Sequence, residues 1–219
     1  NTLIIAMLMV VLVIFLFLGN VRATLIPAVT VPVALIGSMM TLSWFGFSIN
    51  LLTLLALVLA IGLVVDDAIV VLENIYRRIE NGQSPLIAAY EGGREVAFAV
   101  VATTLVLVAV FVPLVFLSGN VGRLFTEFAI TIAAAVIFSS ITALSLTPMM
   151  CSKMLKHRQR SSSFGQFLDK KFAKFEAAYG RALSKSIHQP LLTICIVILS
   201  LVAVYLLFIK LPTEYTPKE

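Results

Sequence analysis

The feature that most constrains this chain is a series of long apolar stretches, each almost free of charged residues. Six of them take up more than half of the 219 residues. A helix of about 20 residues crosses a hydrocarbon layer, whereas an isolated strand would leave its backbone groups unpaired in lipid. The sequence therefore predicts an all-α membrane protein with six transmembrane helices. Their expected positions are Leu3–Leu18, Leu25–Trp44, Asn50–Leu72, Val96–Leu117, Glu127–Met150 and Leu191–Ile209.

Composition points to the same class of protein. Hydrophobic residues make up 60% of the chain and charged residues 12%, and the mean hydropathy of +1.06 exceeds what a water-soluble domain needs to fill its core. The two cysteines, Cys151 and Cys195, show no metal-ligand spacing, and the seven Met residues are dispersed. We therefore expect neither a metal nor a bound cofactor.

Orientation follows from the distribution of Lys and Arg between alternate loops. Thirteen of the sixteen basic residues fall on one side of the predicted membrane, and Arg123, Lys210 and Lys218 fall on the other. Because loops rich in Lys and Arg stay in the cytoplasm, the thirteen mark the cytoplasmic face. With six spans, both ends of the chain then lie on the opposite side. The thirteen are Arg22, Arg77, Arg78, Arg94, Lys153, Lys156, Arg158, Arg160, Lys170, Lys171, Lys174, Arg181 and Lys185.

The segment between the fifth and sixth stretches has a different pattern. A basic, Ser-rich linker covers 153–163, and aromatic and Leu side chains then recur at helical spacing from Phe164 to Leu183, with Lys and Arg between them. This pattern predicts an amphipathic helix in the plane of the cytoplasmic membrane surface, with packing on a soluble domain as the alternative. The expected organisation is five transmembrane helices in 1–152, linker and in-plane helix in 153–189, and the last transmembrane helix with the start of an extracytoplasmic segment in 190–219.

Two adjacent carboxylates, Asp66 and Asp67, interrupt the third apolar stretch. Counted from Asn50, they lie roughly 24 Å along the helix, past the middle of the bilayer. A charge facing lipid there costs at least ~2.5 kcal/mol, so we expect the two to share a buried sector. Such a pair titrates as a coupled unit and can load and release protons; a static ion pair is the alternative. Since no stretch has Lys or Arg near its middle, a counter-cation would come from outside this chain.

Other polar residues are weaker candidates for a proton path. Glu73 lies seven residues after Asp66 on the same helical stripe, where the helix should reach the cytoplasmic interface. Thr103 and Thr104 in the fourth stretch could line a hydrated path, although such hydroxyls more often bond to their own helix. Hydroxyls of the fifth stretch are candidates of the same kind: Thr131, Ser139, Ser140 and Thr142.

Several motifs resemble one transporter family. The segment Gly62–Asn74, GLVVDDAIVVLEN, is preceded by FGFSIN at 45–50 and by RATLIP at 22–27. These segments resemble the resistance-nodulation-division (RND) transporters, specifically the hydrophobe/amphiphile multidrug-efflux branch. The double Asp is similar to that branch, whereas metal-exporting and protein-translocating relatives usually carry a different arrangement around one Asp. Further motifs fit the same family: VFVP at 110–113, FAIT at 128–131 and LTPMMC at 146–151.

The resemblance implies a proton antiporter, not an enzyme, with protons as the coupling ion. The six spans would be the second to seventh of a twelve-helix transporter, and Asp66 and Asp67 its proton relay, paired with a Lys and an Arg on later helices. Proton uptake would break this pairing and move periplasmic domains that extrude drugs. We expect a fragment, since the chain begins at Asn1 without an initiator Met.

The resemblance also implies partners and a location. The partners would be the second half of the same transporter, the other subunits of a trimer, a periplasmic adaptor and an outer-membrane channel. The location would be a bacterial inner membrane, with both ends of the chain in the periplasm and a role in antibiotic resistance. Nucleic acid is not an expected partner, because the basic residues sit where topology alone would place them.

Three alternatives stay open. An intramembrane aspartyl protease also uses two Asp residues, but these usually come from different helices so that they face each other across the substrate. A membrane scaffold or channel could use Asp66 and Asp67 only to select cations or fix the fold. An RND exporter of lipids or metals is the third alternative, and a lipid or fatty-acid cargo would need the same motor.

Overall fold

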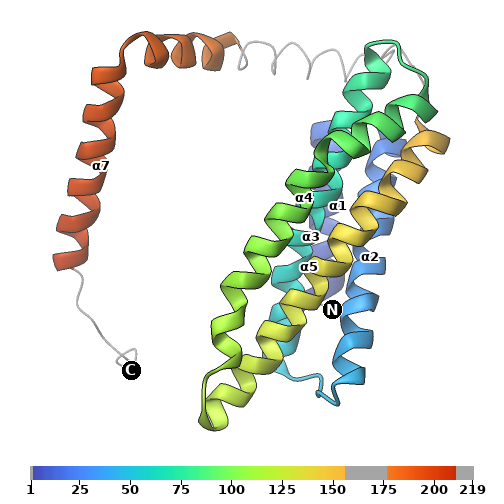
Figure 1. Cartoon of the computed structure of the whole chain (residues 1–219), viewed down its shortest axis with the longest axis vertical. Helices are drawn as coiled ribbons and strands as arrows, with labels where there is room; N and C mark the ends of the chain where they lie inside the picture. Colours follow the sequence, from blue (N-terminus) through green and yellow to red (C-terminus); the bar gives the residue numbers. More distant parts are fainter. Residues whose placement is uncertain (1, 156–176, 211–219) are drawn as a thin grey trace. The chain divides into compact units, whose positions relative to one another are not determined.

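Every regular element that the computed structural model describes is a helix (Figure 1). The described residues are 2–155 and 177–210, and they belong to two compact units, of which the first contains α1–α5 and the second α7. For these residues the prediction of an all-α chain is confirmed. The helices are α1 (Thr2–Leu18), α2 (Val21–Trp44), α3 (Leu51–Glu80), α4 (Pro85–Val115), α5 (Gly119–Met154) and α7 (Pro190–Lys210), with Ala177–His188 before α7.

The helices extend beyond the apolar stretches from which they were predicted. α3 continues to Glu80 rather than ending near Leu72, and α4 begins at Pro85 rather than near Val96. Hydropathy marks the part of a helix that lipid surrounds, whereas the helix itself continues until the backbone meets a turn signal. Here that signal is Gly82, which has a φ of 93°, followed by proline at the first helical position of α4.

Within residues 2–155 and 177–210, four helices are long and apolar enough to cross a membrane: α2, α3, α4 and the part Gly122–Met154 of α5. A fifth span results if Ala177–His188 and Thr193–Ile209, which are bent by 97° to each other, count as one. The apolar part of α1, Leu3–Leu16, is shorter. A count of six spans therefore stays a prediction. The predicted in-plane helix falls largely on residues 156–176, which lie outside the described residues.

Helix α5 is the centre of the first unit. Consecutive helices from α1 to α5 run in opposite directions (Figure 1), and α5 packs against α2, α3 and α4, while α1 packs on α2 and α3. Close approach depends on small side chains: Gly37 of α2 lies against the ring of Phe138, and Ser38 donates a hydrogen bond to the Thr131 carbonyl at 2.9 Å. Small buried side chains also meet between α3 and α5: Ala56 shares a core cluster with Ile132 and Val136, and Ala60 shares one with Ala135.

The alternation of helix direction gathers most basic residues at one end of this unit. Of the six Lys and Arg residues in 2–155, only Arg123 lies near the α4–α5 turn. The other five lie towards the end at which α3 meets α4. They are Arg22, Arg77, Arg78, Arg94 and Lys153.

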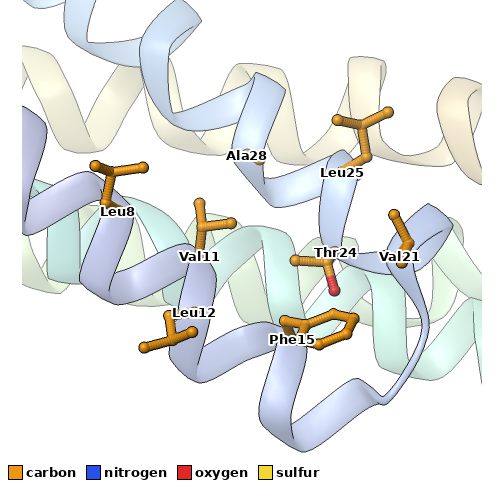
Figure 2. A pocket seen from close by; sticks show the side chains of 8 residues that line it. All are labelled: Leu8, Val11, Leu12, Phe15, Val21, Thr24, Leu25 and Ala28. Atoms are coloured by element: carbon orange, nitrogen blue, oxygen red, sulfur yellow. The ribbon is translucent and has the colours of Figure 1, made fainter.

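An apolar groove of about 330 Å³ opens between α1 and α2 near their connecting turn (Figure 2). Its polar lining residue, Thr24, donates its hydroxyl to the backbone carbonyl of Asn20. The groove therefore presents no free polar group. It is lined by Leu8, Val11, Leu12, Phe15, Val21, Thr24, Leu25 and Ala28.

Candidate functional site

Asp67 lies inside the bundle, on the face of α3 that packs against α5. Only 8% of its surface is exposed, and Val64, Ala68 and Val71 around it on the same helix are buried as well. A carboxyl group among apolar side chains needs a hydrogen-bonding partner, because burial removes it from water. The partner comes from α5: Ser139, itself 1% exposed, has its Oγ 2.9 Å from Oδ2 of Asp67.

The same hydroxyl also reaches the backbone of α3. Oγ of Ser139 lies 3.1 Å from the carbonyl oxygen of Val64, one turn before Asp67. Ser139 is therefore within hydrogen-bonding distance of both a side chain and a main-chain group of α3. It is the hydroxyl, among those predicted on the fifth stretch, that the structure brings to a carboxylate.

Asp66 points away from this interface, on an exposed stripe that runs along α3. Successive helical positions are about 100° apart, so two adjacent side chains point to different faces. Since none of α1–α5 covers this stripe, the expectation that both carboxylates share a buried sector is wrong for these five helices. The stripe consists of Leu51, Leu55, Leu59, Gly62, Asp66, Val70, Glu73 and Arg77.

The weaker sequence candidates have separate positions. Glu73 is exposed on the same stripe as Asp66, as its spacing predicted. Thr103 is exposed, and its hydroxyl contacts the carbonyls of Ala99 and Val100; Thr104 is buried and donates to the carbonyl of Val100 at 2.8 Å. Both threonine hydroxyls thus bond to their own helix, which leaves Ser139 as the hydroxyl that contacts Asp67.

A second polar contact between α3 and α5 was missed from the sequence. Oδ1 of Asn50 accepts a hydrogen bond from the backbone N–H of Thr53 and caps α3, which directs its amide group towards Glu127. The amide nitrogen donates to Oε2 of Glu127, a residue only 6% exposed. The sequence signals were an Asn–x–x–Thr pattern before an apolar run, typical of a helix start, and an acidic residue beside an apolar stretch.

A third polar group joins α3 to α4 near their turn. The side-chain amide of Asn74 donates to the Gly92 carbonyl and to Glu95, both at 2.9 Å. Arg78 forms ion pairs with Glu91 at 2.8 Å and with Glu95 at 2.9 Å. Every charged group of this cluster has a partner inside the chain, so the cluster fixes the helical hairpin.

The two aspartates lack a charged partner in the described residues. In residues 2–155 and 177–210, the ion pairs are those of Arg78, and neither Asp66 nor Asp67 has Lys or Arg beside it. The same residues contain no group of three or more His, Cys, Asp and Glu side chains that could hold a metal ion. The site is therefore a pair of carboxylates, one held by a hydroxyl inside the bundle and one presented on its surface.

Comparison with known protein families gives a match over the whole chain. The family model described as the AcrB/AcrD/AcrF family matches residues 1–219, so the match includes the aspartate segment, the hairpin cluster and both units of the fold. The resemblance inferred from the motifs at 22–27, 45–50 and 62–74 is confirmed. The chain belongs to the AcrB/AcrD/AcrF family of RND transporters.

Proposed function

We propose that this chain is one half of the transmembrane motor of a proton-coupled exporter of drugs or other amphiphiles. The observation that carries the proposal is the division of two adjacent carboxylates between two faces of α3. Asp67 is held inside the bundle by Ser139, while Asp66 is exposed between Gly62 and Val70 on an apolar stripe. Such a pair can exchange protons on one side and meet a partner on the other.

The exposed carboxylate implies a covering segment. A charged carboxylate on a lipid-facing stripe costs on the order of 2.5–3.5 kcal/mol near the middle of the membrane, so Asp66 needs protein in front of it. No cation for it is present in the described residues. The missing partner is the second half of the transporter, which supplies the Lys and Arg counter-charges to the stripe of α3.

The electrostatics of this arrangement support coupling. Two carboxyls on adjacent residues influence each other, so proton uptake by one changes the charge that the covering cations meet. Neutralising the pair weakens its attraction to the cations, and the two halves then move relative to each other. Glu73, on the same stripe nearer the α3–α4 turn, is the proposed outlet of this path. Thr103 and Thr104 have a smaller part, since their hydroxyls are already bonded.

The placement of charge supports an orientation. Five of the six basic residues in 2–155 lie at the α3–α4 end, which the positive-inside rule assigns to the cytoplasm. The motor would then sit in a bacterial inner membrane with both ends of this chain on the periplasmic side. Periplasmic domains, the other subunits of a trimer, an adaptor and an outer-membrane channel would complete the exporter.

The test is export of an amphiphilic dye by the complete transporter in proteoliposomes under an imposed pH gradient. Asp66→Asn and Asp67→Asn should each reduce export to the level seen with an ionophore, because each removes a group that must change charge. Glu80→Gln, an exposed carboxylate at the end of α3, is the matched control and should export normally. Normal dye export by both Asn variants, with the protein correctly inserted, would contradict the proposal and favour a channel or scaffold. Export of lipid or metal instead of dye would change the proposed cargo but keep the proposed motor.

A further inference from the structure

The hydroxyl of Ser139 lies within hydrogen-bonding distance of two oxygen atoms but can donate its proton to only one of them at a time. A serine hydroxyl has one proton to donate and two lone pairs to accept with. Oδ2 of Asp67 lies 2.9 Å from Oγ and the carbonyl oxygen of Val64 lies 3.1 Å from it. The Val64 carbonyl can only accept. The direction of the Asp67 bond therefore depends on whether Oδ2 carries a proton.

The two protonation states give two different sets of bonds. When Asp67 is ionised, Ser139 donates its only proton to Oδ2, a bond strengthened by the charge, and the Val64 carbonyl receives nothing from it. When Oδ2 carries a proton, Asp67 donates that proton to Oγ, and Ser139 is free to donate its own to Val64. Proton uptake thus turns one bond between α3 and α5 into a chain of two, with no proton lost by Ser139.

We propose that Ser139 is a positioning residue that couples the protonation state of Asp67 to the hydrogen bond between α5 and the backbone of α3 at Val64. The inference rests on the proposed function, since it requires Asp67 to change its protonation state. Asp66 is the titratable neighbour on α3 itself. The charged side chains of other described helices that bond to α3 or its cap lie towards its ends: Glu127 at the start, and Glu91 and Glu95 near the turn.

The two states differ in which groups of α3 are bonded to α5. In the ionised state Ser139 is bonded to the side chain of Asp67 alone, by a bond that the charge strengthens. In the protonated state Ser139 is bonded both to that side chain and to the main chain at Val64. Proton uptake therefore adds a backbone contact between the two helices at this level.

The experiment uses the complete transporter in proteoliposomes and two measurements. The first is the infrared band of the protonated carboxyl of Asp67, identified as the C=O stretch that Asp67→Asn removes. Ser139→Ala should shift this band to higher frequency, because the carboxyl loses the oxygen to which it donates. The second is dye export, which Ser139→Ala should reduce roughly five- to tenfold, the equivalent of about one neutral hydrogen bond. Ser139→Thr keeps the hydroxyl and should restore both.

Ser140→Ala is the matched control, since it removes a nearly buried hydroxyl from the adjacent position. It should leave the band in place. An unshifted band in Ser139→Ala would overturn the inference even if export fell, because a structural defect alone lowers export. If Ser139→Ala does not insert, Ser139→Cys replaces it, with the same expected shift. Full export by Asp67→Asn would overturn the proposed function itself. If Asp67→Asn loses export but the carboxyl band of Ser139→Ala is unshifted, only the role of Ser139 is overturned.

Discussion

The two faces of α3 differ in what they need from outside the chain. On the face towards α5, each polar side chain has a partner: Asn50 bonds to Glu127, and Asp67 bonds to Ser139. On the opposite face, Asp66 lies among exposed Leu and Val side chains and has no ion-pair partner in the described residues. The polar groups of the first face are satisfied within this chain, whereas Asp66 on the second face has no ion-pair partner in the described residues. This difference supports the proposal that α5 holds α3 in place and that the contact with the second half of the transporter forms on the stripe of Asp66.

The side chains of the two faces agree with this division. The face towards α5 carries buried Ala56 and Ala60, which let the helix backbones approach closely and make short polar contacts possible. The exposed stripe carries Leu55 and Leu59, which are about half exposed and fit either lipid or a second helical layer. Gly62 interrupts these large side chains one turn before Asp66 and leaves open space there.

The largest effect on stability is expected at the contact between Asn50 and Glu127. Asn50→Ala removes the cap of α3 and leaves a buried carboxyl group without its donor. The free energy of unfolding of the chain in detergent micelles should fall by about 2–4 kcal/mol, of which ~1 kcal/mol comes from the cap and about 1–3 kcal/mol from the unpaired group. Denaturant titration followed by circular dichroism measures this change.

Glu127→Gln is the control for that prediction. It keeps an oxygen that accepts from the Asn50 amide, and it leaves the cap to Thr53 intact. It should therefore destabilise the chain clearly less than Asn50→Ala. Equal losses of unfolding free energy in the two variants would mean that the charge of Glu127, not the hydrogen bond, joins the helices at this end. The face of α3 towards α5 would then not owe its stability to paired hydrogen bonds.

An intermediate effect is expected from crowding the buried face. Ala60 is fully buried between α3 and its neighbours, so Ala60→Leu forces extra atoms into a packed interface and should cost about 1–3 kcal/mol. The matched change on the adjacent position, Leu59→Ala, removes atoms from the exposed stripe and should alter the stability of the chain far less. The same denaturant titration compares the two. A larger loss in Leu59→Ala would show that the stripe is already packed in the isolated chain.

Much of the fold follows from the sequence because lipid leaves the backbone few choices. Apolar stretches of this length must be helical, and Asp66 and Asp67 are conspicuous because carboxylates are costly inside such a stretch. The ends of the helices were less predictable, since α3 continues past the apolar region to Glu80 and its end is set by the turn at Gly82.

Which of the two aspartates is buried and which is exposed depends on tertiary packing. Either face of α3 could have met α5, and hydropathy does not distinguish them. One signal was available: Asp67 shares its face with Ala56 and Ala60, and small residues favour close helix packing. Ser139 could not be singled out among four hydroxyls of the fifth stretch, because its contact with Asp67 depends on how α5 is positioned along α3.

The smallest effect on the chain itself, and the sharpest test of the comparison, is expected at Gly62. A Cβ at this position meets nothing within 4 Å, so Gly62→Leu should leave the stability of the chain unchanged or raise it by up to ~1 kcal/mol through helix propensity. In the complete transporter the same side chain lies one turn from Asp66, where the proposed function requires the covering helices to approach. Gly62→Leu should therefore abolish dye export although the chain is stable, whereas Ala60→Leu should lower stability both in the chain alone and in the complete transporter. Normal export by Gly62→Leu would show that the stripe faces lipid, and Asp66 would then need another explanation for its tolerance inside the membrane.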